Sequence, residues 1–234
     1  MTEFLEAIIP NVIDYKEKFY DACIATLEMF LISGIFSFIF GLAVGVLLTI
    51  TKKDGIKENT VVYFILDSFI NVFRAVPFLI LLIFLIPFTR AIVGTAIGVT
   101  GAIIPLIFGT VPFFSRQVET ALANVAPGKI EAARSMGSGT LELIFRVYLS
   151  EAVPELVRVT TITAISLVGL TTMAGAVGAG GLGSFCISYG QSLNNQDIVI
   201  VCVIVLLVFV CILQTIGSFL AKKSTNRKIF QKRR

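Results

Sequence analysis

The chain has 234 residues, of which 56% are hydrophobic and 15% charged; its formal net charge is +4 and its mean hydropathy +0.92. Soluble domains carry about 25% charged residues, so this composition excludes an ordinary soluble protein and indicates one embedded in a membrane. The sequence has no histidine, and its four cysteines show no paired spacing, which argues against a Cys/His metal site and histidine-dependent catalysis. We therefore expect no catalytic residue, no metal site and no cofactor bound by this chain.

Five stretches are long and apolar enough to cross the hydrocarbon core, which takes about 20 residues of helix. They cover about 24–50, 62–87, 92–115, 154–176 and 197–221. Three runs contain no charged residue at all, at 29–51, 91–115 and 198–221. The sequence therefore predicts an all-α polytopic membrane protein in which residues 1–234 form a single transmembrane domain with five spans.

The second predicted span contains two charged residues, Asp67 and Arg74. A charge inside a span is costly unless it is neutralised or hydrated, so we expect both side chains to have partners in the cytoplasmic half, serving either structure or gating. Pro77 and Pro112 remove backbone hydrogen bonds from the second and third spans and are expected to kink them.

Two Gly-x-x-x-Gly pairs, Gly41/Gly45 and Gly94/Gly98, allow helix backbones to approach each other closely. Such a contact can lie within one subunit or between two copies of the chain. The spacing alone does not distinguish the two, and we keep both as hypotheses.

A glycine-rich segment, 175–183, follows the fourth span. Because residues 159–196 carry no charge and would form a helix nearly twice as long as the core is thick, we expect the helix to break at these glycines. The Gly-x-Gly-x-x-Gly spacing resembles a dinucleotide-binding fingerprint, but no strand is predicted before it, and 184–197 is polar and turn-like. We expect instead a pathway or gate contribution, with Met173 either a gate or only a packing residue. The candidate residues are Met173, Gly178, Gly180 and Gly181.

The positions of Lys and Arg predict the topology. The tail 222–234 carries seven basic and no acidic residues, so we expect it in the cytoplasm, next to lipid headgroups rather than nucleic acid. Counting back across five spans places 116–153 and 51–60 in the cytoplasm. The N-terminal 1–21, with five acidic and two basic residues, is then expected outside.

The predicted cytoplasmic loop 116–153 has its own helical pattern. Pro127 is a suitable first residue of a helix that Gly137 or Gly139 would end. A second helix follows, with an apolar face at helical spacing formed by Leu141, Ile144, Phe145, Tyr148 and Leu149. Two hypotheses fit: a helix lying on the bilayer surface, or a docking element for a cytoplasmic partner.

The segment "EAARSMGSGTLELIFRVYLSEAVP" resembles the EAA loop of ABC-importer permeases, in which Glu-Ala-Ala is followed four residues later by Gly. The family motif ends in Leu-Pro, whereas this chain has Leu149-Ser150 and its proline at Pro154, which changes the exit of the loop. The resemblance implies contacts with an ATPase through Glu131, Ala132, Ala133, Gly137, Leu141 and Phe145. "NVFRAVPFLILLIFLIPFTRAIVGTAIG", "IIPL" and "MAGAVGAGGLG" are similar to the methionine-importer subfamily, in the same order.

This resemblance implies that the chain is a transport subunit, not an enzyme, and carries methionine inward across the cytoplasmic membrane. The sequence lacks Gly-x-x-x-x-Gly-Lys-Ser/Thr, so ATP and Mg would be bound by two separate ATPase subunits. A second copy of the chain and an extracytoplasmic substrate-binding lipoprotein would complete the assembly. The alternatives are a permease for another amino acid or small peptide, an ion-coupled carrier acting alone, and a membrane scaffold.

Overall fold

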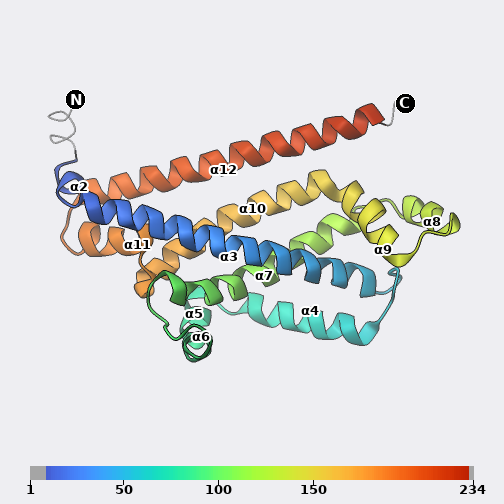
Figure 1. The fold of residues 1–234 in the computed structure, drawn as a ribbon, viewed down its shortest axis with the longest axis horizontal. Coiled ribbons are helices and arrows are strands. Elements are labelled where there is room, and N and C mark those ends of the chain that lie inside the picture. The colour runs from blue at the N-terminus through green and yellow to red at the C-terminus, as the bar shows by residue number, and fades with distance from the viewer. Residues whose placement is uncertain (1–8, 232–234) are drawn as a thin grey trace. The chain divides into compact units, whose positions relative to one another are not determined.

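The computed structural model describes residues 9–231, and every regular element in that part of the chain is a helix (Figure 1). The elements are α2 (Pro10–Asp14), α3 (Lys16–Thr51), α4 (Thr60–Ala75), α5 (Phe78–Phe84), α6 (Ile86–Val93), α7 (Gly98–Ala123), α8 (Pro127–Ser135), α9 (Thr140–Glu142), the π-helix η1 (Leu143–Leu149), α10 (Ser150–Ala174), the π-helix η2 (Gly175–Ala179), α11 (Gly181–Phe185), the π-helix η3 (Cys186–Gln191) and α12 (Gln196–Gln231). Within these residues, four helical stretches are long and apolar enough to cross a membrane, and α4 with α5 is a fifth if the pair forms one span. The all-α membrane class predicted from the sequence is confirmed.

The second predicted span is not one continuous helix. α4 ends at Ala75, the chain loses helical bonding at Val76, and Pro77 precedes α5 with an extended ψ of 133°. Proline has no N–H to donate and disfavours helical geometry in the residue before it. The kink expected at Pro77 is therefore a full interruption of the helix.

The third predicted span begins later and ends later than expected. Gly94 closes α6 in the left-handed conformation, with φ of 81°, and α7 starts only at Gly98. α7 then continues without interruption through Pro112 to Ala123, so residues 116–123 of the predicted loop are helical. Gly94 and Gly98 both have positive φ and open space around them, so they do not form a helix-packing pair.

The chain divides into two compact units, which we describe separately. The first unit comprises the described residues 9–36, 76–109 and 164–212. Its core joins the start of α3, α11 and the start of α12, which Figure 1 shows next to one another. The buried residues are Val12, Ala22, Leu182, Phe185, Ile198 and Cys202. Asp197 accepts hydrogen bonds from the backbone N–H and the side-chain amide of Asn11, at 3.0 and 2.9 Å, and so fastens α2 to the first turn of α12.

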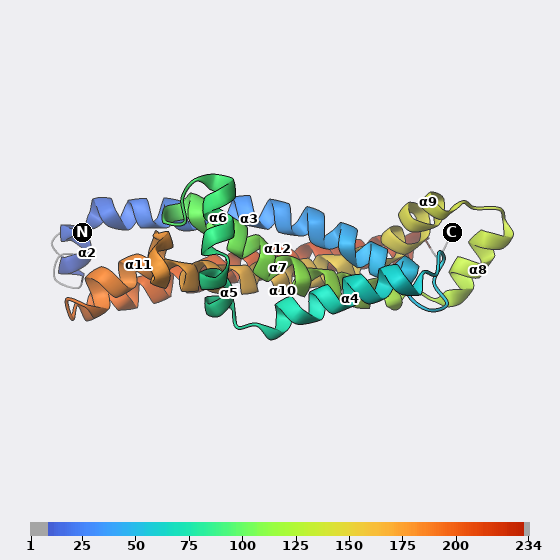
Figure 2. The ribbon, with the colours of Figure 1, turned by 90° about the horizontal axis from the view of Figure 1, so that it is seen from below.

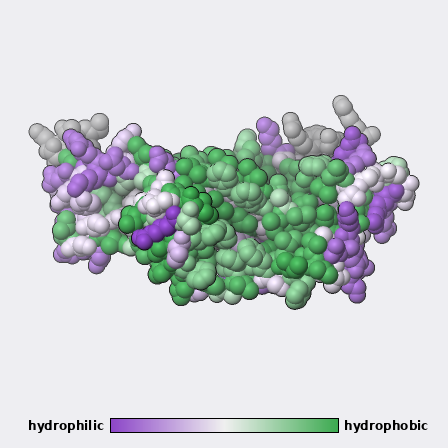
Figure 3. Space-filling view, turned by 60° about the horizontal axis from the view of Figure 1, so that its bottom comes forward, coloured by the Kyte–Doolittle hydropathy of each residue, from purple (hydrophilic) through white to green (hydrophobic). Residues whose placement is uncertain are grey.

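The second unit comprises residues 37–75 and 110–163 and the described part of the chain after 212. In it α3 and α7 pack closely, because a Cβ atom at Gly41 would lie 2.6 Å from Cδ1 of Phe114 and one at Gly45 would lie 2.6 Å from Cβ of Val118. The Gly41/Gly45 pair therefore makes a contact within one chain. Figure 3 shows hydrophobic side chains over the visible surface of α4 and hydrophilic ones at the end of this unit that carries α8.

Candidate functional site

The hairpin, residues 127–149, consists of α8, a glycine turn, α9 and η1, and Figure 2 shows its two arms at one end of the second unit. Pro127 is the first residue of α8, where its missing N–H is not needed. Gly137 ends the helix with φ of +86°, and its N–H donates to the carbonyl of Arg134 at 2.9 Å. The helix start at Pro127 and the turn at Gly137, both predicted from the sequence, are confirmed.

Polar bonds and buried side chains anchor the hairpin to the rest of the second unit. Lys129 forms an ion pair with Glu151 at 2.8 Å, and a guanidinium N–H of Arg134 donates to the carbonyl of Ile56 at 3.1 Å. Tyr148 lies in the same hydrophobic core as Val118 and neighbouring residues of α7. The hairpin is thus held at α8 and at η1, and the turn between its arms projects.

Three large hydrophobic side chains of the hairpin are exposed, among charged ones such as Lys129 and Arg146. The side chains of Met136, Leu141 and Phe145 are 80%, 71% and 65% exposed, although each is a large hydrophobic residue. Glu131 and Ala132 are also exposed, whereas Ala133 is buried. Large apolar side chains exposed outside a lipid-facing helix lose their contact with water when a partner protein covers them.

One expectation about the second arm is wrong. The sequence places Leu141, Ile144, Phe145 and Tyr148 on one face, but the structure buries Ile144 and Tyr148 together with Leu143, and exposes the other two. The cause is the π-helical bonding of Leu143–Leu149, since each π turn takes up an extra residue and rotates the face that meets the core. The two coupling candidates of this arm, Leu141 and Phe145, are the exposed ones.

The glycine segment, residues 175–183, breaks the helix at the predicted place. Val177 and Gly178 have non-helical backbone angles, and Gly180 has φ of 83° and ψ of −157°, a region open essentially to glycine alone. Gly181 opens α11 at φ of 75°. The turn after α10 therefore depends on glycine at 180 for its conformation.

Close packing adds a second requirement at this segment. A Cβ atom at Gly181 would lie 2.7 Å from Oγ1 of Thr26 and 2.8 Å from Cε of Met29. The Thr26 hydroxyl oxygen accepts a buried hydrogen bond from the backbone N–H of Leu182 at 2.8 Å, which ties α11 to α3. Met173, one turn before the break, is about half exposed, so its side chain is not a core residue of the first unit.

The expectation that 184–197 is turn-like is wrong for most of its length. α11 and η3 carry helical structure up to Gln191, and only 192–195 form a turn before α12. The misleading signal was the polar composition. Phe185 and Tyr189 indicate the helix instead. They stand four residues apart, one helical turn, and their ring centroids are 5.1 Å apart.

Asp67, one of the two charged residues in the second predicted span, belongs to a cluster of charged side chains in the second unit. The guanidinium of Arg116 on α7 pairs with Asp67 on α4 and, at 2.6 Å, with Glu119. Asn71 donates to Asp67 at 2.8 Å and accepts from Arg116 at 3.1 Å. Asp67 therefore has a partner, and Arg116 and Glu119 are members that sequence reasoning missed. The available signal was that Arg116 is the first charge after a long apolar run.

Arg74 behaves differently from Asp67. Its side chain is exposed and forms no ion pair with any residue in the described part of the chain. Residues 9–231 also contain no group of three or more Cys, Asp or Glu side chains placed to hold a metal ion.

Comparisons with known proteins agree with these features. The model of the family described as "binding-protein-dependent transport system inner membrane component" matches residues 37–226. Over 202 residues the chain is 44% identical to the probable D-methionine transport system permease protein MetI of Vibrio cholerae, covering 86% of this chain and 90% of that one. Over 140 residues it is 49% identical to the D-methionine transport system permease protein MetI of Salmonella typhimurium, covering 60% and 64%.

The fold is similar to that of a chain in an inward-facing structure of the MetNI methionine ABC transporter. The TM-score is 0.87 at 41% identity, and the match covers 90% of this chain and 98% of that chain. The resemblance to ABC-importer permeases seen in the sequence is thereby confirmed. The hairpin and most of the candidate spans lie within the matched residues, and the chain belongs to the family of binding-protein-dependent transport system inner membrane components.

Proposed function

We propose that this chain is the permease subunit of an ATP-driven importer and that it carries methionine inward across the cytoplasmic membrane. The main support for methionine as the transported substrate is the 44% identity, over 86% of the chain, to a protein named as a D-methionine permease. The likeness to a chain of a methionine ABC transporter supports the same cargo. Another amino acid or a small peptide is the alternative cargo for the same machine.

The energy for transport comes from separate ATPase subunits that bind the hairpin. Its anchored arms and exposed apolar side chains are suited to insertion into a cleft on a partner, as Met136, Leu141 and Phe145 lose their contact with water there. Ala132 keeps this face narrow, and Glu131 is free to pair with a basic group. ATP and Mg are bound on the ATPase. The surface-helix alternative is less favoured, because the bonds from Lys129 and Arg134 hold the hairpin against protein.

The rest of the assembly follows from the family. Two copies of this chain form the pathway, two ATPase chains bind their hairpins, and a substrate-binding lipoprotein delivers cargo from outside. The N-terminus lies outside and the basic C-terminal tail in the cytoplasm. Residues 232–234 of that tail lie outside the described residues.

The glycine segment lies at the outer end of the pathway in this proposal. Its backbone, which carries no side chain at Gly178, Gly180 and Gly181, permits the sharp return from α10 into α11. Met173 and Val177 are exposed on the last turns before the return, and Met173 is the candidate gate. Substrate passes this point after release from the binding protein.

The test is uptake into liposomes that contain this chain together with its ATPase and its binding protein. We expect labelled methionine to accumulate only when ATP is present on the ATPase side and the binding protein is on the other. Excess unlabelled methionine should compete, and an unrelated amino acid should not. If methionine is not taken up, but a binding protein loaded with another compound stimulates ATP hydrolysis, that compound is the substrate and methionine is not. Accumulation without ATP would contradict the importer itself.

A further inference from the structure

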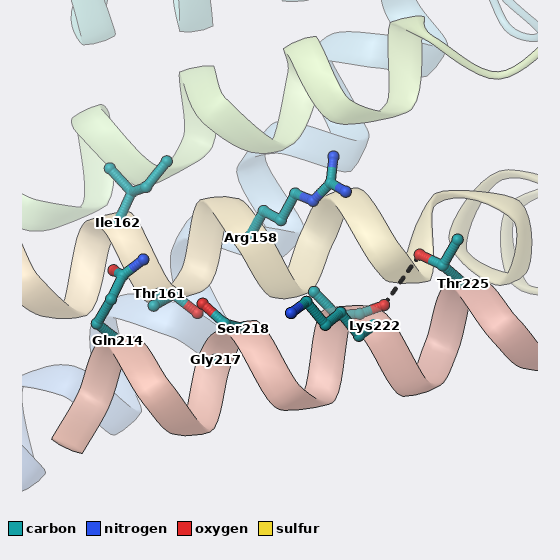
Figure 4. A pocket seen from close by; sticks show the side chains of 9 residues that line it. Arg158, Thr161, Ile162, Gln214, Gly217, Ser218, Lys222 and Thr225 are labelled. Atoms are coloured by element: carbon teal, nitrogen blue, oxygen red, sulfur yellow. Dashed lines mark hydrogen bonds between the residues drawn. The ribbon is translucent and has the colours of Figure 1, made fainter. Parts of the chain in front are cut away.

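A cavity of about 460 Å³ lies between α10 and α12 in the second unit, and six of its nine lining residues are polar or charged. Figure 4 shows Arg158 and Thr161 on α10 and Gln214, Ser218, Lys222 and Thr225 on α12. None of the nine described lining residues is acidic. Two cations, one from each helix, and several uncharged polar groups therefore line one hollow, with the Arg158 guanidinium directed away from α12 in Figure 4.

A close helix crossing explains why the hollow exists. A Cβ atom at Gly217 would overlap the side chain of Thr161, so at this point only that side chain lies between the backbones of α10 and α12. The two helices run in opposite directions (Figure 1). Arg158, three residues before Thr161, and Lys222, five after Gly217, consequently lie on the same side of the crossing, where the hollow opens.

The lining offers hydrogen-bond donors to an anion. The hydroxyls of Thr161 and Thr225 donate to carbonyls of their own helices at 2.8 and 2.9 Å, so they are not the donors. Arg158 has an exposed contact with Glu155 at 3.3 Å, a weak pair that leaves most of its five N–H groups available. Lys222 forms no ion pair with any side chain that the structure describes. Together with the Ser218 hydroxyl, one turn before Lys222, these groups match the oxygens of a phosphate.

The surroundings of the cavity point to a lipid as the source of that phosphate. Apolar side chains also line the cavity itself, Ile162 on α10 and Ala221 on α12, and Ile162 is about half exposed. A ligand that places a phosphate between Arg158 and Lys222 and hydrocarbon on these residues is a phospholipid. A headgroup with net negative charge is favoured, since no acidic lining residue is present to pair with a choline or ethanolamine cation.

We propose that this cavity is a binding site for the headgroup of an anionic phospholipid, held by Arg158 and Lys222, at the membrane surface where α12 leaves the bilayer. The site is distinct from the hairpin and does not depend on the cargo. Its role is to fix the spacing of α10 and α12 on the side of the crossing that the helices themselves leave open.

The experiment is native mass spectrometry of the purified full chain in detergent, titrated with phosphatidylglycerol, phosphatidylcholine or inorganic phosphate. The double variant Arg158→Gln/Lys222→Gln is compared with Lys223→Gln, which removes the neighbouring exposed cation that does not line the cavity. Each cation near a charged headgroup contributes about fivefold in affinity, so the double variant should bind phosphatidylglycerol ~30-fold more weakly than the wild type. Lys223→Gln should retain most of the affinity.

Two further arms decide the ligand. The variant Arg158→Lys/Lys222→Arg keeps both charges and should keep phosphatidylglycerol binding. If it binds normally, the weaker binding of Arg158→Gln/Lys222→Gln is due to the lost charges and not to a disturbed helix pair. The proposal would be overturned if Lys223→Gln lost as much phosphatidylglycerol affinity as the double Gln variant, or if phosphatidylcholine bound as tightly as phosphatidylglycerol. The first result would mean a general attraction of lipid to the basic end of α12, and the second would mean that the headgroup charge is not recognised. Displacement of the lipid by millimolar inorganic phosphate would also overturn it and make the site one for a free anion.

Discussion

The hairpin 127–149 and the glycine segment 175–183 are both rich in small residues, yet they use them in opposite ways. In the hairpin, Pro127 and Gly137 set the backbone, and the large side chains Met136, Leu141 and Phe145 are left exposed. In the glycine segment, the backbone itself is packed, and Thr26 bonds directly to the N–H of Leu182. In the proposed assembly the hairpin presents side chains to a partner, whereas the glycine segment excludes side chains so that the chain can turn.

The largest effect is expected when exposed side chains of the hairpin are replaced. Such a replacement should weaken binding of the ATPase and leave the stability of this chain unchanged. The double variant Leu141→Ser/Phe145→Ser should bind the ATPase about 100-fold more weakly, because two central apolar contacts are lost. Its thermal unfolding in detergent should match that of the wild type, since both side chains are exposed. The control is Leu193→Ser, an exposed leucine elsewhere. An equal loss of ATPase binding in the control would contradict the docking role.

The glycine segment should respond in the opposite manner. Gly183→Ala places a methyl group against the backbone carbonyl of Thr172, which cannot move aside, so unfolding should become easier by about 2–3 kcal/mol. Gly169→Ala is the matched control, because nothing lies within 4 Å of a Cβ there. Thermal unfolding of the two variants separates packing from helix propensity. Similar midpoints for both would show that the segment is not close-packed.

A smaller effect is expected from the polar contact between α3 and α11. Thr26→Val keeps the shape but leaves the buried N–H of Leu182 without its acceptor, which costs about 1–3 kcal/mol. Thr120→Val serves as the control, since the hydroxyl of Thr120 bonds only to the carbonyl of Arg116 on its own helix. Faster amide exchange at Leu182 in the first variant alone is the expected result, and unchanged exchange would argue against the contact.

The smallest effect concerns the backbone of the hairpin. Gly137→Ala forces an alanine into φ of +86° in open space, at a cost of about 1–2 kcal/mol, whereas Gly139→Ala, with φ of −73°, should be neutral. Hydrogen exchange of α8 measures the difference. A large loss of ATPase binding with intact α8 would mean that Gly137 itself touches the partner.

The sequence was sufficient where one local cause decides the structure. Pro127 and Gly137 define the hairpin arm by capping, the glycines at 178 and 180 break the helix, and apolar runs give the membrane class. The sequence was insufficient where contacts between residues distant in sequence decide the local structure. The π-helical turns of η1 bury Leu143 in place of Leu141, and α11 with η3 forms because Phe185 packs on Phe19, with centroids 5.6 Å apart. The pairing of Asp67 with Arg116 likewise depends on the placement of α7 beside α4.

The most direct test of the account is to measure ATP hydrolysis and methionine uptake in the same liposomes for the wild type, Glu131→Arg and Glu17→Arg. Both substitutions reverse an exposed acidic side chain, one on α8 of the hairpin and one on the first turn of α3. We predict that Glu131→Arg abolishes ATP-driven uptake while the protein still inserts, and that Glu17→Arg transports at close to the wild-type rate. Uptake that survives Glu131→Arg and proceeds without ATP would contradict the proposal that the hairpin couples this chain to an ATPase.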